Sequence, residues 1–260
     1  MSETQTAVNA IEMRGIVMEF SGVRALDGVD FSLRQGQVMG LVGKNGAGKS
    51  TLVNLACRFF EPTSGQILID GRDYRERSQL WLHSNIGYVL QNPHLFSGTI
   101  RENIRYGRLD ATDEEVIAAA KAANADHFIR TLPGGYQMEL NEDASNVSQG
   151  QKQLLTIART ILADNRILIL DEATAFADPD NEAKVQAAFA ELAKGKTVVM
   201  IAHRLSTVVN ADCIYVVQDG RIAEAGTKGD LCARNGLFAK MWQDYQSSVR
   251  WKVEKEGPAC

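Results

Sequence analysis

One short segment constrains the fold of this chain more than any other feature. Residues 43–50 follow the pattern GxxxxGKS, between an apolar run at 38–42 and a helical pattern that continues to Phe59. Glycines let backbone N–H groups curl around an anion, and the helix that follows adds the positive end of its dipole. Lys49 supplies a point charge to a polyphosphate, and the Ser50 hydroxyl can ligate Mg²⁺. The segment therefore predicts a phosphate-binding loop between a buried strand and a helix.

The run 167–172 supplies the acidic counterpart of this loop. It is an apolar strand pattern that ends in Asp171 and Glu172. Carboxylates at the C-terminal end of a buried parallel strand lie at the sheet edge where ligands bind. Asp171 is expected to hold the Mg²⁺ shell, and Glu172 to polarise a water for attack on the γ-phosphorus. Together the two segments indicate a P-loop NTPase.

Strand and helix patterns alternate along most of the chain, which predicts an α/β fold with a mainly parallel sheet covered on both faces. Strands at 11–20 and 29–33, with turns at Gly22 and Gly28, predict an antiparallel sheet at the start. The other expected strands are 38–42, 67–69, 86–90, 167–171, 197–202, 214–217 and 221–225, and the expected helices include 112–130, 148–162, 181–194 and 237–253.

Three local signals refine this pattern. Asp219-Gly220 predicts a two-residue hairpin turn between the last two strands. Thr112 with Glu115, and Ser148 with Gln151, have the spacing of capping boxes, which predicts that helices begin just after Thr112 and Ser148.

Composition excludes several classes of protein. The chain has 260 residues, with 28 basic and 32 acidic side chains and a net charge of −4. This balance disfavours bulk binding to duplex nucleic acid, which needs a positive field. No apolar run approaches the roughly 18–20 residues that span a bilayer, and the start of the chain lacks the pattern of a signal peptide. The cysteines form no CxxC pair, so we expect reduced structural thiols in a cytosolic protein; they are Cys57, Cys213, Cys232 and Cys260.

Residues 147–151 read Val-Ser-Gln-Gly-Gln at the start of a predicted helix, between the two phosphate-site segments. With this segment the chain resembles ATP-binding cassette (ABC) proteins, whose signature at this place is LSGGQ. Gln91 matches the Q-loop of that family, Asp178 its D-loop and His203 its switch histidine. The resemblance extends from about residue 11 to about residue 245.

The resemblance implies that residues 1–260 form one ABC ATP-binding domain. The expected architecture is a RecA-like P-loop NTPase core at about 11–91 and 163–246, with an antiparallel β subdomain. A helical insertion subdomain is expected at about 92–162.

The resemblance also implies ATP and Mg²⁺ as ligands, with two ATP molecules sandwiched between two cassettes. Lys49, Gln91, Glu172 and His203 are the expected catalytic residues, and Ser50, Gln91 and Asp171 are the expected metal ligands. The expected nucleotide contacts are Phe20, which stacks on adenine, then Gly43, Lys44, Asn45, Gly46, Ala47, Gly48, Lys49, Ser50 and Thr51, and finally Ser148, Gln149, Gly150 and Gln151 from the second cassette.

Most of the chain is similar to the exporter branch of the family. The stretch 95–104, the Asp-Glu-Ala-Thr at 171–174 and the segment 201–207 carry this similarity, whereas residues 22–28 and 43–51 are closer to sugar importers. The expected partners are a transmembrane transporter subunit or domain and a second cassette, at the cytoplasmic face of a membrane. No nucleic acid is expected.

Several positions depart from the family pattern. Gln149 replaces the first signature glycine, Val147 replaces leucine, and Ala-Phe-Ala-Asp at 175–178 replaces Ser-Ala-Leu-Asp. Asn-Glu-Asp at 141–143 stands where exporters have Gly-Glu and a variable residue. Gln149 keeps its backbone N–H, so we expect it to leave the phosphate contacts of this helix intact.

The competing interpretations are of different classes. An ABC-type ATPase that acts on nucleic acid or ribosomes would carry long insertions, tandem cassettes or a basic face. A helicase would need a second RecA-like domain, although residues 171–174 resemble a DEAD-type box. A nucleotide sensor that does not hydrolyse would not need Glu172 and His203. The sequence favours an ATPase that drives transport.

Overall fold

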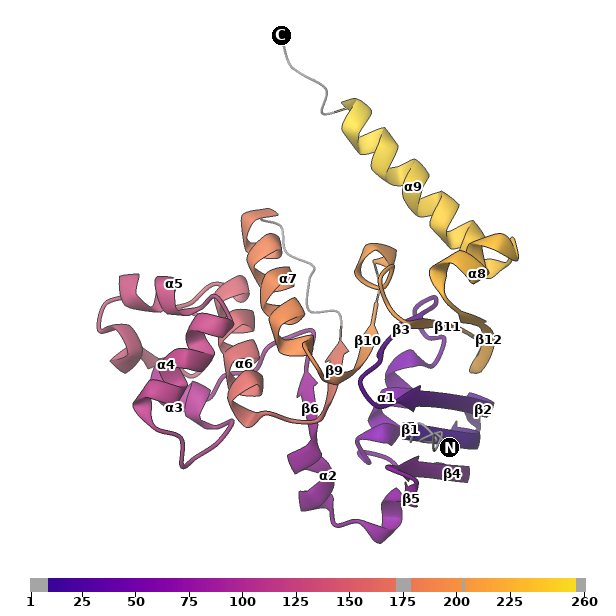
Figure 1. Ribbon diagram of the computed structural model, residues 1–260, viewed down its shortest axis with the longest axis horizontal. Coiled ribbons are helices and arrows are strands. Elements are labelled where there is room, and N and C mark those ends of the chain that lie inside the picture. The colour runs from indigo at the N-terminus through magenta and orange to yellow at the C-terminus, as the bar shows by residue number, and fades with distance from the viewer. Residues whose placement is uncertain (1–8, 172–178, 203, 256–260) are drawn as a thin grey trace, which may run out of the picture. The chain divides into compact units, whose positions relative to one another are not determined.

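A computed structural model describes residues 9–171, 179–202 and 204–255 of the chain (Figure 1). The chain divides into two compact units. The first comprises Met1–Tyr74 and Met200–Cys260, and the second comprises Arg75–Val199. The narrower limits expected for a helical subdomain, about 92–162, stay a prediction.

An antiparallel sheet opens the first unit, as predicted. Its strands lie in the order β2-β1-β4-β5, with β1 at Asn9–Phe20, β2 at Val23–Arg34, β4 at Ser64–Ile69 and β5 at Arg72–Asp73. Ile11 and Met13 of β1 are buried, whereas Glu12 between them is partly exposed. This alternation buries one face of the sheet and leaves the other to solvent.

Gly28 does not mark a turn, which corrects the sequence prediction. It lies inside β2, where Ile16 pairs with Val29 and Met18 pairs with Leu26. Between these two pairs β2 therefore has one residue more than β1, which is a β-bulge. A glycine signals a bulge and a turn alike, so the local sequence did not separate the two.

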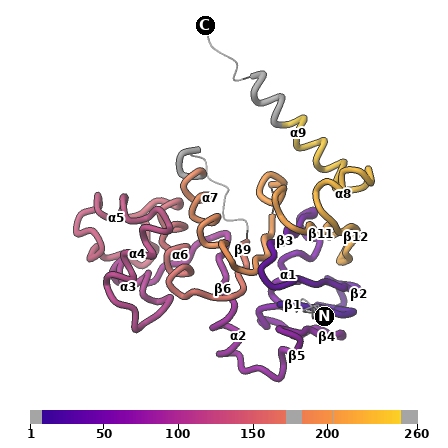
Figure 2. The backbone as a smooth tube through the Cα atoms, in the orientation of Figure 1, coloured from indigo at the N-terminus to yellow at the C-terminus, as the bar shows by residue number. Residues whose placement is uncertain are grey.

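The rest of the first unit contains a pair of short parallel strands. β3 (Val38–Val42) runs parallel to β11 (Cys213–Gln218), and β11 forms a hairpin with β12 (Arg221–Gly226). The predicted hairpin turn is confirmed, with positive φ angles of 48° at Asp219 and 74° at Gly220. Helices α1 (Lys49–Ala56), α8 (Lys228–Ala233) and α9 (Leu237–Lys255) complete this unit, and Figure 2 shows α9 following directly on α8.

The second unit is mainly helical. Its parallel strands β6 (Ile86–Val89) and β9 (Ile167–Asp171) pair with each other, and α6 contacts α3, α4, α7 and β6. Its other α-helices and short strands are α2 (Gln79–Asn85), β7 (Gly98–Thr99), α3 (Ile100–Arg105), α4 (Asp113–Ala122), α5 (Asp126–Thr131), β8 (Glu139–Leu140), α6 (Gln149–Ala163) and α7 (Pro179–Ala193). β10 (Thr197–Ile201) carries the chain back into the first unit.

The single helix predicted at 112–130 is two helices. Thr112 caps α4 through the predicted capping box with Glu115. Asn124 then adopts a left-handed conformation with φ 55°, which separates α4 from α5. Asparagine tolerates this conformation better than other non-glycine residues. Because the alanines around Asn124 favour helix, the sequence predicted one continuous helix there.

Within the described ranges, none of the helices combines the length and the hydropathy of a membrane span.

Candidate active site

The phosphate loop lies where the sequence predicts it. β3 ends at Val42 and α1 begins at Lys49, with Gly48 as the helix N-cap. Ala47 fixes the loop through two backbone hydrogen bonds, because its N–H donates to Lys44 O at 3.2 Å and its carbonyl accepts from Gly220 N at 3.1 Å. The loop is therefore tied both to itself and to the hairpin that joins β11 and β12.

Gly43 is a position where the loop admits no side chain. Its φ is 152°, and a Cβ built there would stand 2.2 Å from the carbonyl oxygen of Val217. Atoms cannot approach so closely, so another residue at 43 would displace the loop or β11. The first glycine of the motif is thus required by the packing of its own unit.

The amino group of Lys49 lies against the backbone of the loop. Its side chain is only 5% exposed, and its amino group donates to the carbonyls of Gly43 at 2.7 Å and Lys44 at 3.0 Å. The first backbone N–H groups of a helix, here including Ser50 and Thr51, have no acceptor within the helix. A buried ammonium beside a helix start is a donor set that fits a polyphosphate. The exposed Ser50 at this end of α1 fits a Mg²⁺ ligand.

In the second unit, the structure brings Asp171 and Gln91 to the same edge of a parallel strand pair. Val89 lies opposite Leu170, so Asp171 at the end of β9 and Gln91 just beyond β6 both follow the carboxyl ends of their strands. Asp171 is partly buried, and one of its carboxylate oxygens accepts a hydrogen bond from a tyrosine hydroxyl at 3.4 Å. An oxygen-rich edge of this kind suits Mg²⁺.

That tyrosine, Tyr88, was missed by sequence reasoning. It is a residue of β6, and its hydroxyl orients the carboxylate of Asp171. The sequence indicated this role only through the hydroxyl group that Tyr88 carries within an otherwise apolar strand.

The signature segment forms the N-terminus of α6 as predicted. Ser148 is the N-cap, Gln151 N–H donates to its hydroxyl at 3.3 Å, and the Gln151 side chain accepts from Ser148 N–H at 2.8 Å. Gln149 is exposed, whereas Gly150 is buried. The Gln149 side chain therefore leaves from the helix surface, and its backbone N–H stays at the helix start.

Phe20 is the last residue of β1, and its ring packs against the ring of Phe60. Sequence reasoning missed Phe60, although it is a large aromatic residue in the polar connection after α1. Glu172 and His203, two of the expected catalytic residues, and Asp178, which matches the D-loop, lie outside the described part of the chain.

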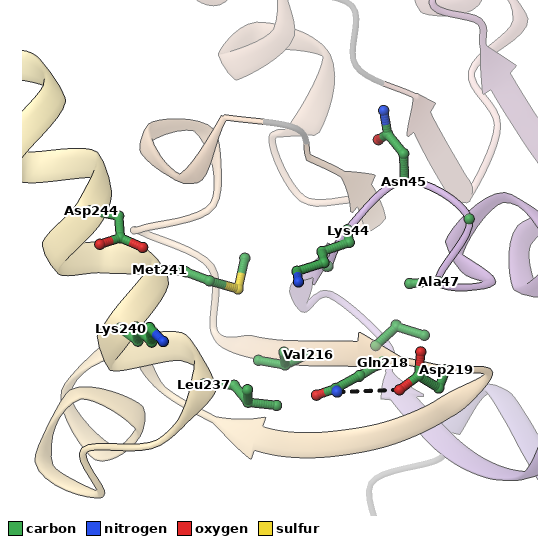
Figure 3. A pocket seen from close by; sticks show the side chains of 13 residues that line it. Lys44, Asn45, Ala47, Val216, Gln218, Asp219, Leu237, Lys240, Met241 and Asp244 are labelled. Carbon is green, nitrogen blue, oxygen red and sulfur yellow. Dashed lines mark hydrogen bonds between the residues drawn. The ribbon is translucent and has the colours of Figure 1, made fainter.

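A hollow of about 520 Å³ lies on one flank of the phosphate loop (Figure 3). Its lining includes Lys44 and Asn45 of the loop, the end of β11, and Lys240, Met241 and Asp244 of α9. In Figure 3 the Lys44 side chain extends toward β11 and the Asn45 side chain points the other way. The two loop side chains thus differ from Lys49, whose amino group folds back onto the loop.

Comparison with known proteins gives a consistent result. A family profile described as "ABC transporter" matches residues 26–175. An uncharacterized ABC transporter ATP-binding protein of Bacillus subtilis (strain 168) is 48% identical over 235 residues, which cover 90% of this chain and 39% of that protein. A fatty acid ABC transporter ATP-binding/permease protein of Mycobacterium bovis is 50% identical over 206 residues, 79% of this chain and 33% of that protein. The chain thus spans less than two fifths of the length of either relative.

A solved structure of a bacterial Atm1-family ABC exporter with ATP bound is similar to this chain with a TM-score of 0.85 and 39% identity. The similarity covers 91% of this chain and 42% of that chain. It confirms the predicted fold class, a P-loop NTPase with a mixed sheet and helices.

Proposed function

The chain belongs to the ABC transporter family of ATP-binding domains, and from this we propose that it hydrolyses ATP to drive a membrane transporter of the exporter type. One observation carries the proposal above the others: the GxxxxGKS loop connects β3 to α1 with a buried Lys49 over it. The ATP-bound state of the similar exporter structure supports ATP as the nucleotide.

We assign the phosphate contacts to the first unit. Lys49 and the backbone N–H groups of residues 43–51 hold the β- and γ-phosphates, and they oppose the negative charge that builds up on the oxygens of the γ-phosphoryl group. Phe20 stacks on adenine. Ser50, Gln91 and Asp171 are the oxygen donors assigned to Mg²⁺. When bound, the ion would supply positive charge that offsets the negative charge of the phosphates.

Glu172 and His203 complete the proposed mechanism from outside the described ranges. Glu172 follows Asp171 at the end of β9, and we assign it to orient the attacking water and to accept its proton. His203 follows the end of β10, and we assign it to stabilise the negative charge of the γ-phosphoryl group. Both assignments rest on sequence position and family resemblance.

The second cassette supplies the other side of each nucleotide in this proposal. The N-terminus of α6 presents a Ser148 hydroxyl and backbone N–H groups, which is the chemistry that meets a phosphate. The exposed Gln149 side chain does not remove any of these groups. Two copies of the chain, or this chain and a related one, therefore bind two ATP molecules head to tail.

The proposed membrane partner follows from the relatives. One of them is named as an ATP-binding/permease protein, and the chain spans about a third of it. We therefore place the chain at the cytoplasmic face of a membrane, with the surface around Gln91 toward the transmembrane partner. These relatives do not support the alternative of an ABC ATPase that acts on nucleic acid or ribosomes.

A pair of lysines in the same loop tests the proposal. Lys49→Ala removes the buried ammonium, so the dissociation constant for ATP should rise about tenfold to hundredfold, the equivalent of one or two charge-assisted hydrogen bonds. Lys44→Ala removes an equal charge from a side chain that lines the hollow beside α9, and it keeps the backbone N–H. It should weaken binding by less than about threefold. Calorimetric titration with ATP measures both, and equal effects of the two variants would refute the assignment of Lys49.

A further inference from the structure

We propose that Phe60 is a positioning residue for the nucleotide base: it holds the Phe20 ring in the orientation in which adenine stacks on it. The inference deepens the proposed function and rests on it, because it concerns how the same ATP site selects a base.

The geometry of the two rings is the first support. Their centroids lie 5.5 Å apart at an interplanar angle of 84°, an edge-to-face pair. This is a favoured aromatic arrangement, and it resists rotation of either ring. Because the rings are perpendicular, Phe60 covers at most one face of Phe20, so its ring does not by itself prevent a flat base from stacking on the other face.

The exposure of the pair is the second support. Phe20 is 39% exposed and Phe60 is 43% exposed, although each carries only hydrocarbon in its side chain. Core packing does not account for two adjacent aromatic rings at the surface, since their burial is incomplete. A small exposed apolar patch is a typical surface for a ligand with an apolar face.

The backbone around both rings is fixed, which is the third support. Thr63 ties the connection after α1 to the end of β1: its N–H donates to Val17 O at 2.9 Å, and its hydroxyl accepts from Glu19 N–H at 3.0 Å. Glu19 directly precedes Phe20, and Thr63 lies three residues after Phe60. The two hydrogen bonds therefore hold the segments that carry the rings against each other.

Helix α1 links this connection to the phosphate site. α1 starts at Lys49, and after its last residue the chain turns at Arg58, whose φ is 58°. Arg58 N–H donates to Leu55 O at 3.0 Å, which fixes this turn. One short stretch of chain thus sets both the lysine for the phosphates and the ring that supports the base-stacking side chain. Because the Phe20 ring is already ordered before ATP binds, binding does not incur the entropy cost of ordering that ring.

Phe60→Ala tests the inference, with Phe60→Tyr as the conservative variant. Loss of the edge-to-face support should raise the dissociation constant for ATP about threefold to tenfold, and Phe60→Tyr should restore it to within about twofold of wild type. Inorganic tripolyphosphate competes with ATP for the phosphate site but has no base. Its inhibition constant against ATP binding should therefore be the same in Phe60→Ala as in wild type. A merely structural role for Phe60 would weaken both ligands together.

A double-mutant cycle separates action through Phe20 from direct contact. Phe20→Ala should weaken ATP binding at least as much as Phe60→Ala, and Phe60→Ala should have no further effect in the Phe20→Ala background. The inference is overturned if Phe60→Ala binds ATP like wild type, or if Phe60→Ala still weakens ATP binding in the Phe20→Ala background. It is also overturned if Phe60→Ala weakens the binding of tripolyphosphate as much as that of ATP. ATP binding that is indifferent to Lys49→Ala would instead overturn the proposed function itself.

Discussion

Gly43→Ala isolates the contribution of loop geometry to nucleotide binding. The added Cβ would stand 2.2 Å from Val217 O, whereas a carbon and a carbonyl oxygen approach no closer than about 3.3 Å. The loop must therefore move by about 1 Å, which displaces its backbone N–H donors from the phosphates. Loss of one or two hydrogen bonds to a charged group costs about tenfold to hundredfold in affinity. We expect the dissociation constant for ATP to rise about tenfold to hundredfold, with the fold retained.

Gly36→Ala is the matched control. Gly36 has a positive φ of 77° in the connection between β2 and β3, and a Cβ there would meet nothing within 4 Å. It therefore incurs the backbone strain of about 1–2 kcal/mol without a clash. Thermal unfolding should report this loss for Gly36→Ala, while calorimetry should show ATP affinity within about twofold of wild type. If Gly43→Ala binds ATP normally, or if Gly36→Ala weakens binding equally, the clash is not what positions the loop.

Three further predictions follow from the second unit and the buried thiol. Gln149→Gly should change steady-state ATPase less than about tenfold, whereas Gly150→Asp should abolish it by placing a negative charge beside the phosphates; the reverse order would show that this helix end does not meet the nucleotide. Asn103→Ala should lower the urea-measured free energy of unfolding by about 2–4 kcal/mol, because this fully buried amide exchanges hydrogen bonds with both backbone groups of Phe96. A loss below about 1 kcal/mol would contradict that role. Burial raises the pKa of the Cys57 thiol to about 12, so it should resist Ellman's reagent at neutral pH until the chain unfolds, and rapid labelling would contradict this.

The features that sequence predicted best are those that consecutive residues determine. The phosphate loop is one continuous segment, and its glycine, lysine and serine spacing fixes the path of the backbone there. The capping boxes at Thr112 and Ser148 depend on residues three apart, and both form as expected. The turn at Asp219 and Gly220 is equally local.

Three features that sequence missed depend on pairing between segments that are separate in the chain. Tyr88 meets Asp171 only because β6 and β9 are neighbours. Phe60 meets Phe20 because the connection after α1 is hydrogen-bonded to the end of β1. The bulge at Gly28 likewise appears only in the register between two strands. No local pattern encodes these contacts, because each residue taken alone is compatible with several environments.

The proposal that this chain hydrolyses ATP with a carboxylate-oriented water is tested most directly by Glu172→Gln. The change keeps the size of the side chain and one acceptor oxygen, and it replaces the other carboxylate oxygen with an uncharged NH2 donor, so ATP should still bind while the attacking water loses its acceptor. We predict that steady-state ATP turnover falls at least about hundredfold while the dissociation constant for ATP stays within about threefold of wild type. Turnover by Glu172→Gln at the wild-type rate would contradict the account, because the water would then be oriented by another residue.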